Sequence, residues 1–235
     1  MINNRKILCV ITARANSKGL KNKNILKISN KELLAYPIIA ALKSKYIDTT
    51  LLSSDSKKYL SIGKKYGAYT PFLRPKSISN DKSTSYSVLK HAIKYLEKIG
   101  KKYEYLICLE PTSPLTTSKD LDKAIEVLTK TKCDSLVSIA FNEKYLIPYH
   151  FKKNKKNIIK SYLNKGKSLK RRQEINLKTF FLDGSLYMST VDSFLKNKGF
   201  ISNKTYGFLM PKHKSFEIDD KIDFEIIKSL FRLKK

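Results

Sequence analysis

The first apolar run of the chain constrains the fold most, because it has the length of a strand and contains no polar residue. Residues 7–11 read Ile-Leu-Cys-Val-Ile, and a polar, basic loop follows directly. A continuous apolar run of this length is typical of a parallel strand that is buried on both faces. We therefore expect a central first strand over Lys6–Ala13.

Helical and strand-like patterns alternate along the rest of the chain. Helical spacing is found at Leu33–Lys45, Ser56–Tyr66, Thr84–Ile99, Lys119–Lys130 and Asp219–Phe231, and strand-like runs at Thr49–Ser53, Tyr105–Leu109, Ser135–Ile139 and Leu182–Met188. Alternation of this kind indicates a parallel sheet covered by helices. The sequence predicts one Rossmann-like, three-layer α/β domain over residues 1–235 with a mainly parallel sheet, whose ligands would bind beyond the carboxyl ends of the strands.

Residues 142–180 break this alternation. They are rich in Lys and Asn with isolated Tyr, Ile and Leu, and they include the basic tract at residues 152–156. A connection of this length is too long for an ordinary loop in a compact domain. We expect an arm inserted within the domain.

The charge of the chain is strongly positive, with 48 Lys and Arg against 20 Asp and Glu and a formal net charge of +28. Dense positive charge suits nucleic acid or an anionic membrane surface. Here the lysines are spread over every predicted helix and loop, without the interleaved aromatics and glycines of an RNA-binding surface. A solvated basic surface is favoured, and a basic RNA-binding protein remains the less favoured alternative.

The amino terminus begins with polar residues and leads into a strand-like segment, and no run of eighteen apolar residues occurs. These features predict neither a signal peptide nor a membrane span. The three cysteines are far apart and lack metal-binding spacing. We expect a cytoplasmic protein with no membrane partner.

The loop at Ala13–Asn24 follows the first strand and is rich in cations. It contains Arg14, Ser17, Lys18, Gly19, Lys21, Lys23 and Asn24. Arg can bind phosphate oxygens through two nitrogens, Lys adds compact charge, and Gly permits turns that direct backbone N–H groups at an anion. The loop alone indicates anion binding, and a surface turn in a Lys-rich chain would look the same.

Several segments together give the chain a resemblance to a known family. Arg14-x-x-Ser17-Lys18-Gly19 with Lys23-Asn24 closely resembles the nucleotide-binding loop of the CMP-sialic acid synthetases and their relatives for legionaminic and similar nonulosonic acids. Seven further segments recur in the family's order, namely residues 53–56, 71–75, 80–85, 109–115, 171–173, 183–184 and 217–219. The resemblance spans nearly the whole chain.

The resemblance implies a cytidylyltransferase that transfers CMP from CTP to an acidic nonulosonic acid with Mg²⁺ and releases pyrophosphate. It also implies a homodimer formed through the arm and a place in lipopolysaccharide or capsule biosynthesis. Arg14, Lys23 and Asp219 would be catalytic. The nucleotide would be bound by Ala13, Arg14, Ser17, Lys18, Gly19, Lys23 and Asn24, with Arg74 and Ser85 on the cytosine.

The sugar site is implied at Glu110, Arg171, Arg172, Gln173 and Asp183, where one of the two arginines would reach the partner's sugar carboxylate. Many sialic acid enzymes have Gln at Glu110, commonly Asn at Asp183, and can have Arg at Phe181. An ionised carboxylate only accepts hydrogen bonds, whereas an amide also donates. These departures favour a nonulosonate other than sialic acid, and they leave open another acidic sugar such as a 3-deoxy-octulosonate relative.

The metal site is expected at Glu217 and Asp219. In an extended segment these carboxylates face the same side, as a shared Mg²⁺ site requires. Asp219 is alternatively placed to cap the last helix. The scattered histidines and the absence of a Ser/His/Asp pattern favour direct in-line attack of the sugar hydroxyl on the α-phosphorus, without a covalent enzyme intermediate.

Overall fold

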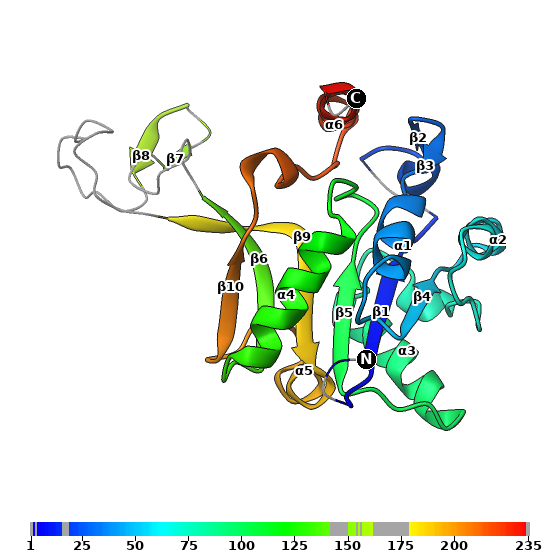
Figure 1. Cartoon of the computed structure of the whole chain (residues 1–235). Helices are drawn as coiled ribbons and strands as arrows, with labels where there is room; N and C mark the ends of the chain where they lie inside the picture. The colour runs from blue at the N-terminus through cyan, green and yellow to red at the C-terminus, as the bar shows by residue number, and fades with distance from the viewer. Residues whose placement is uncertain are drawn as a thin grey trace.

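A mixed sheet forms the centre of the chain in the computed structural model, which describes residues 2, 4–15, 19–141, 150–153, 155, 157–161 and 179–233. Its strand order is β10-β6-β9-β5-β1-β4 (Figure 1). The strands are β1 (Ile7–Thr12), β4 (Thr49–Ser53), β5 (Tyr105–Leu109), β6 (Ser135–Phe141), β9 (Phe180–Thr190) and β10 (Thr205–Leu209). β9 alone among these six runs antiparallel to its neighbours, so the predicted mainly parallel sheet is confirmed.

Helices cover both faces of this sheet and give the predicted three layers. They are α1 (Ala35–Leu42), α2 (Lys57–Lys65), α3 (Ser85–Lys98), α4 (Ser118–Lys130), α5 (Val191–Asn197) and α6 (Lys221–Leu233). Ile7, Cys9 and Ile11 of β1 pack in one core cluster with residues of α1, α2 and α4, while Leu8 and Val10 pack in a second with residues of α3 and α5. β1 is apolar at every position from 7 to 11 because it lies between two buried layers.

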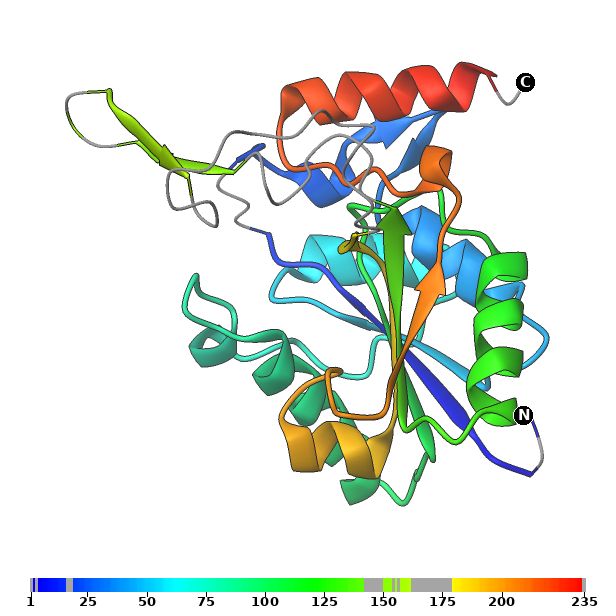
Figure 2. The same cartoon turned by 90° about the vertical axis from the view of Figure 1, so that its left-hand side faces the viewer.

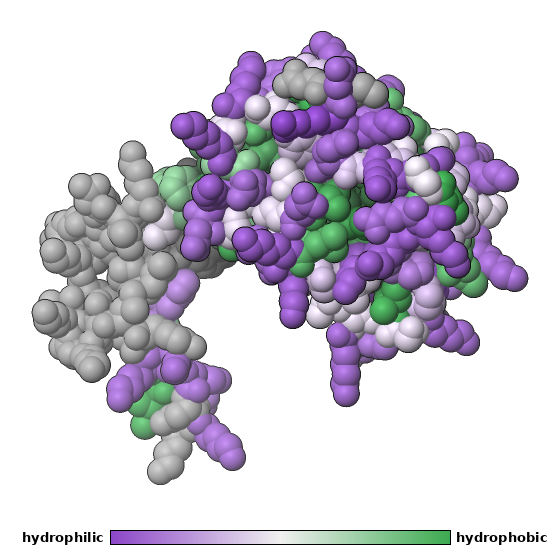
Figure 3. Space-filling model, turned by 90° about the horizontal axis from the view of Figure 1, so that it is seen from below, coloured by the Kyte–Doolittle hydropathy of each residue, from purple (hydrophilic) through white to green (hydrophobic). Residues whose placement is uncertain are grey.

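None of the helices in the described ranges has the length and apolar character needed to cross a membrane. On the face shown in Figure 3, hydrophilic side chains are spread over the surface. That distribution agrees with the dispersed lysines seen in the sequence.

Among the strands and α-helices of the main body, four short ones were not predicted. They are β2 (Lys27–Ile28) and β3 (Lys31–Glu32), joined by Ser29 and Asn30 with φ of 46° and 63°, and α5 and β10. The hairpin strands have only two residues each, and β10 is an edge strand with no fully buried residue, so neither leaves an apolar pattern in the sequence. β9 also begins at Phe180, two residues before the predicted strand.

The expected arm is described only in part. β7 (Phe151–Lys153) and β8 (Ile159–Ser161) pair as an antiparallel hairpin that lies away from the main sheet (Figure 2). Residues 142–149 and 162–178 lie outside the described residues. The dimerisation role of the arm therefore stays a prediction.

Helix α6 lies over the β2–β3 hairpin at the carboxyl ends of the strands (Figure 2). Ile227 of α6 packs in a third core cluster with Ile28, Leu33, Leu115 and Ile218. The alternative in which Asp219 caps this helix is wrong, since it is the neighbouring Asp220 whose carboxylate accepts hydrogen bonds from the N–H groups of Ile222 (2.7 Å) and Asp223 (3.0 Å). Asp219 is left beside the ends of the strands.

The central position of β5 generates a stability prediction. Leu106 is fully buried in this strand, so Leu106→Ala should lower the free energy of unfolding by about 2–5 kcal/mol through lost burial and a residual cavity. Urea unfolding measures this change. Leu233→Ala is the matched control, because Leu233 is 83% exposed and its truncation should change the free energy by less than about 0.5 kcal/mol. Equal losses in the two variants would contradict the assigned core.

Candidate functional site

A pocket of about 490 Å³ opens at the carboxyl ends of β1 and β5. Its lining comes from loops that are far apart in the sequence, including the ends of both strands and the segment before α6. The lining residues are Thr12, Arg14, Gly19, Lys23, Asn24, Arg74, Ile78, Ser79, Asn80, Asp81, Ser83, Thr84, Ser85, Val88, Glu110, Pro111, Thr112 and Asp219. The structure thus gathers in one place the described residues predicted for phosphate and cytosine binding, except Ala13, together with Glu110 and Asp219.

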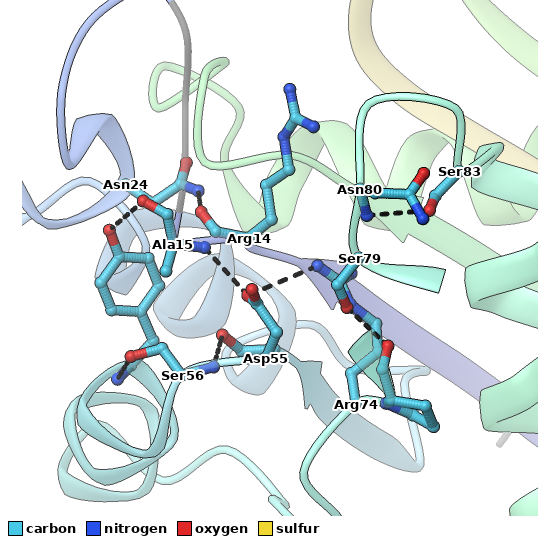
Figure 4. Close-up of polar contacts among 12 residues, drawn as sticks. Arg14, Ala15, Asn24, Asp55, Ser56, Arg74, Ser79, Asn80 and Ser83 are labelled. Atoms are coloured by element: carbon cyan, nitrogen blue, oxygen red, sulfur yellow. Dashed lines mark hydrogen bonds and ion pairs between the residues drawn. The ribbon is translucent and has the colours of Figure 1, made fainter. Parts of the chain in front are cut away.

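The start of the loop after β1 is held by side chains on three sides (Figure 4). Asn24 donates from Nδ2 to the carbonyl oxygen of Arg14 at 3.0 Å. The N–H of Ala15 donates to Asp55 at 2.9 Å, and its carbonyl oxygen accepts from the Tyr59 hydroxyl at 3.4 Å. Ala13 is buried and its N–H extends the pairing with β4, so the loop leaves the sheet from a fixed point.

Gly19 belongs to this loop and is required by a close approach. A Cβ at this position would come within 2.5 Å of the carbonyl oxygen of Asp219, so only glycine lets the two segments meet. The predicted residues Ser17 and Lys18 lie outside the described residues. Their nucleotide contacts stay predictions.

The two predicted phosphate-binding cations each face a carboxylate across the pocket. Arg14 pairs with Asp81 at 2.8 Å. Lys23 lies 3.3 Å from an oxygen of Asp219 and donates to the carbonyl oxygen of Ile218 at 2.6 Å. Because these pairs are partly exposed, an incoming polyanion can replace the carboxylates at little cost.

Arg74 is almost fully buried, with 4% of its surface exposed. Its Nε donates to Ser79 at 3.0 Å, and its Nη2 lies 3.8 Å from Asp55. Burial lowers the pKa of Arg74, Asp55 opposes that change, and Arg14 adds to it. The guanidinium is fixed by these neighbours.

Ser85 lines the same pocket as the first residue of α3. The helix cap is Thr84, whose side chain accepts from the N–H of Ser87 at 3.2 Å. Ser85 is therefore not needed as the cap, which leaves its predicted contact with the base possible. That contact stays a prediction.

Glu110 and Glu217 meet through Thr112. The Thr112 hydroxyl lies 3.0 Å from Glu217 and 3.5 Å from Glu110. Burial, and then the charge of Glu217, raise the pKa of Glu110 to about 7, against the opposing effects of Lys23 and Thr112. Burial also raises the pKa of Glu217. Glu217 lies over Gly184, where a Cβ would come within 2.6 Å of its carboxylate.

Asp183 is buried and lies outside the pocket lining. Its carboxylate accepts hydrogen bonds from the Ser138 hydroxyl, the Ser185 N–H (3.1 Å) and the Ser185 hydroxyl (3.2 Å). A sugar would have to compete with these three internal donors, so the structure assigns Asp183 a role in joining β6 to β9. The predicted sugar-binding residues Arg171, Arg172 and Gln173 lie outside the described residues.

The pocket suits a metal that is shared with a ligand. Within the described ranges no group of three or more His, Cys, Asp or Glu side chains is assembled to hold a metal ion. Mg²⁺ is usually held by one or two carboxylates together with substrate phosphates and waters. The side chain of Asp219 is 80% exposed and lines the pocket, so Asp219 fits this arrangement, whereas Glu217 is not part of the pocket lining.

Sequence reasoning missed Asp55, Asp81 and Thr112 as parts of the site. All three lie in segments that resemble the family, at residues 53–56, 80–85 and 109–115. No role was predicted for them, because their partners Ala15, Arg14 and Glu217 come from other loops. Only the strand order brings those loops together.

The chain is similar to known proteins over nearly its whole length. A family model described as cytidylyltransferase matches residues 8–234. The chain is 34% identical over 232 residues to a CMP-N,N'-diacetyllegionaminic acid synthase of Campylobacter jejuni, covering 97% of this chain and 96% of that one. It is 31% identical over 228 residues to a pseudaminic acid cytidylyltransferase of the same species, covering 97% of each.

Two further matches extend the comparison. An N-acylneuraminate cytidylyltransferase of Escherichia coli is 31% identical over 229 residues, covering 94% of this chain and 51% of that protein. Among solved structures, a CMP:2-keto-3-deoxy-manno-octonic acid synthetase complexed with CTP has a TM-score of 0.69 at 14% identity, covering 98% of this chain and 100% of that one. The second likeness supports the fold.

The environment of Glu110 generates a pH prediction. The pKa of Glu110 is about 7 in the folded chain, against an ordinary value of 4.5. Between these two pH values the folded state binds more protons than the unfolded state. The contribution of Glu110 to the free energy of unfolding is therefore lost as pH rises through 7. Glu110→Gln removes this titration. The stability of the variant relative to the wild type should rise by about 2–3 kcal/mol between pH 5 and pH 8.

Urea unfolding at a series of pH values measures this difference. Glu97→Gln is the control, because Glu97 is exposed on α3 and its replacement should leave the pH dependence of the wild type unchanged. A constant difference between Glu110→Gln and the wild type across the series would contradict the raised pKa.

Proposed function

Because the chain belongs to the cytidylyltransferase family, we propose that it transfers CMP from CTP to an acidic nonulosonic acid and releases pyrophosphate. The observation that carries this proposal is the convergence of Arg14, Lys23 and Arg74 on one pocket with Glu110 and Asp219. The relatives named for pseudaminic, legionaminic and neuraminic acids support this class of sugar.

In this proposal the triphosphate takes the place of one carboxylate, Asp81, and binds beside a second, Asp219. Phosphate oxygens would displace Asp81 from Arg14 and share Lys23 with Asp219, since these ion pairs lie in the pocket wall. A guanidinium can bind phosphate through two parallel hydrogen bonds, and an ammonium adds compact charge. Both groups would then stabilise the charge that develops on the departing pyrophosphate.

Mg²⁺ is the proposed cofactor, held by Asp219 and Glu217 together with the phosphates. When bound, the metal neutralises triphosphate charge and polarises the phosphorus–oxygen bonds. Lys23 contacts Asp219 and the carbonyl oxygen of Ile218, so it keeps the carboxylate at the pocket edge. The remaining rate enhancement would come from holding the anomeric hydroxyl of the sugar in line with the α-phosphorus, without a covalent enzyme intermediate.

The sugar would bind beside Glu110 and Thr112. An ionised carboxylate there accepts hydrogen bonds from hydroxyl and amide N–H groups, which nonulosonic acids carry in number. The sugar's own carboxylate would be met by Arg171 or Arg172, with Gln173, from the arm of the partner in a homodimer. We further propose a cytoplasmic enzyme that supplies an activated sugar for lipopolysaccharide or capsule synthesis.

A substrate panel tests this proposal. Purified protein with CTP and Mg²⁺ should release pyrophosphate with at least one of pseudaminic, legionaminic and N-acetylneuraminic acids, and chelation of the metal should stop the release because the triphosphate charge is no longer neutralised. Coupled detection of pyrophosphate measures the rate. Release only with a 3-deoxy-octulosonate would point to the alternative acidic sugar, and no release with any sugar would contradict the enzyme assignment.

Substitution of Arg14 tests its proposed role in binding the triphosphate. Arg14→Ala should lower kcat/KM for CTP by at least about 100-fold, because a group that stabilises the triphosphate in the transition state is lost. Arg5→Ala is the matched control. Arg5 precedes the opposite end of β1 and donates to the Tyr105 hydroxyl at 2.9 Å, so its loss should leave kcat/KM for CTP nearly unchanged. Equal effects of the two substitutions would contradict the role of Arg14.

A further inference from the structure

We propose that Asp55 is a positioning residue that holds the nucleotide loop and Arg74 in one arrangement, and so sets both the affinity for CTP and the preference for cytosine over uracil. This inference rests on the proposed function, and it concerns a residue that does not line the pocket. Asp55 contacts the lining residue Arg74 directly, and it acts on the lining residue Arg14 through the N–H of Ala15.

One oxygen of Asp55 serves both neighbours. Its Oδ1 accepts a hydrogen bond from the N–H of Ala15 at 2.9 Å and lies 3.8 Å from Nη2 of Arg74 (Figure 4). The side chain of Asp55 is 15% exposed and that of Arg74 is 3% exposed, so water screens this ion pair poorly. A single carboxylate therefore fixes the distance between the two nucleotide-binding segments.

The first of these segments is the loop that carries Arg14. The Asp55 carboxylate binds the peptide N–H of Ala15, and the Tyr59 hydroxyl binds the carbonyl oxygen of the same residue. Ser56 caps α2 by accepting from the N–H of Tyr59 at 3.3 Å, so Asp55 and Tyr59 belong to one rigid start of that helix. Loss of the carboxylate would free the peptide next to Arg14 while leaving the helix cap intact.

The second segment is the one that carries Arg74. The N–H of Arg74 donates to the carbonyl oxygen of Ser54 at 2.8 Å, so backbone and side chain of Arg74 are both tied to residues 54–55. Ser79 accepts from Nε, and a guanidinium has five N–H donors, so donors remain for a ligand. Without the charge of Asp55 a buried cation loses its counter-ion and its fixed orientation.

Orientation of Arg74 matters for the choice of base because a guanidinium donates and does not accept. Cytosine offers acceptors at O2 and N3, whereas uracil has an N–H at N3. A guanidinium held toward O2 and N3 of the base favours cytosine. With uracil, a guanidinium N–H would face the N–H at N3, and two buried donors would be left without an acceptor. A guanidinium free to turn away loses this discrimination.

Asp48 provides a matched control. Its carboxylate accepts from the N–H of Ile7 at 2.8 Å, so it binds a backbone N–H at the opposite end of β1 in the same way. Asp48 is not part of the pocket lining. If an Asp of this kind served only to hold the backbone, substitution of Asp48 and substitution of Asp55 would have the same effects.

The test compares Asp55→Asn, Asp55→Ala and Asp48→Asn with the wild type. Affinities for CTP and UTP are measured by calorimetry without sugar, kcat/KM for CTP by pyrophosphate release, and stability by urea unfolding. Asp55→Asn keeps an acceptor for the N–H of Ala15 but loses the charge. It should therefore weaken CTP binding and reduce the ratio of CTP to UTP affinity by about tenfold.

The other variants complete the comparison. Asp55→Ala should have a larger effect on kcat/KM for CTP, because it also releases the loop, while KM for the sugar stays within about twofold of the wild type. Asp48→Asn should lose stability without any change in the CTP to UTP ratio. If Asp55→Ala does not fold, Asp55→Asn alone decides the question.

The outcomes separate this inference from the proposed function. If the wild type binds CTP but Asp55→Asn keeps the affinity ratio of the wild type, the positioning role is wrong and the proposed function stands. If Asp48→Asn changes the ratio as much as Asp55→Asn does, the effect is a general loss of structure and the inference is again overturned. A wild type that binds neither nucleotide overturns the proposed function and this inference with it.

Discussion

Parallel pairing of β1 with β4 and β5 is the interaction on which the rest of the structure depends. The pairing aligns Thr12 with Ser53 on one side and Ile11 with Leu109 on the other. The loops that begin at residues 13, 54 and 110 therefore leave the sheet at the same level. Because β1 is buried on both faces, its register cannot shift without exposing apolar side chains, and the spacing between the three loops is fixed by the core.

The pocket lining balances positive and negative charge, whereas the chain as a whole is strongly basic. Over the whole sequence 48 basic residues outnumber 20 acidic ones, yet each cation of the pocket has a carboxylate beside it. Three cations gathered without counter-charges would repel one another and lose the orientation that a ligand needs. The side chains of Asp81 and Asp219 are 47% and 80% exposed, whereas that of Asp55 is only 15% exposed and lies against the buried Arg74. The carboxylates beside the pocket cations thus fall into two groups. Asp81 and Asp219 are accessible to a ligand, whereas Asp55 is largely shielded from one.

The sequence predicts the parts of this protein that depend on local patterns. The apolar runs of β1, β4, β5 and β6 and the amphipathic helices between them are each visible in a short window, and family-like segments identify Arg14, Lys23 and Arg74 before any of them is placed. What could not be predicted depends on pairing between distant segments. The antiparallel insertion of β9 between β5 and β6 is one case, and it explains why Asp183 turns toward Ser138 instead of the pocket. The contact of Asp55 with Ala15 is another, since it requires β4 to lie beside β1.

The carboxylates near Thr112 constrain how an acidic sugar can lie in this site. Burial raises the pKa of both Glu110 and Glu217, and the charge of Glu217 raises the pKa of Glu110 further, so a third carboxylate beside them would be disfavoured. In the proposed complex the carboxylate of the sugar would therefore point away from Glu110 and Glu217, and its hydroxyl and amide groups would point toward them. The carboxylate of the sugar would then be left for the arginine proposed to bind it, Arg171 or Arg172 of a partner. In this arrangement the negative pocket wall and the positive arm would together select the orientation of the sugar, and the nucleotide loop would only have to supply the phosphorus in line with it.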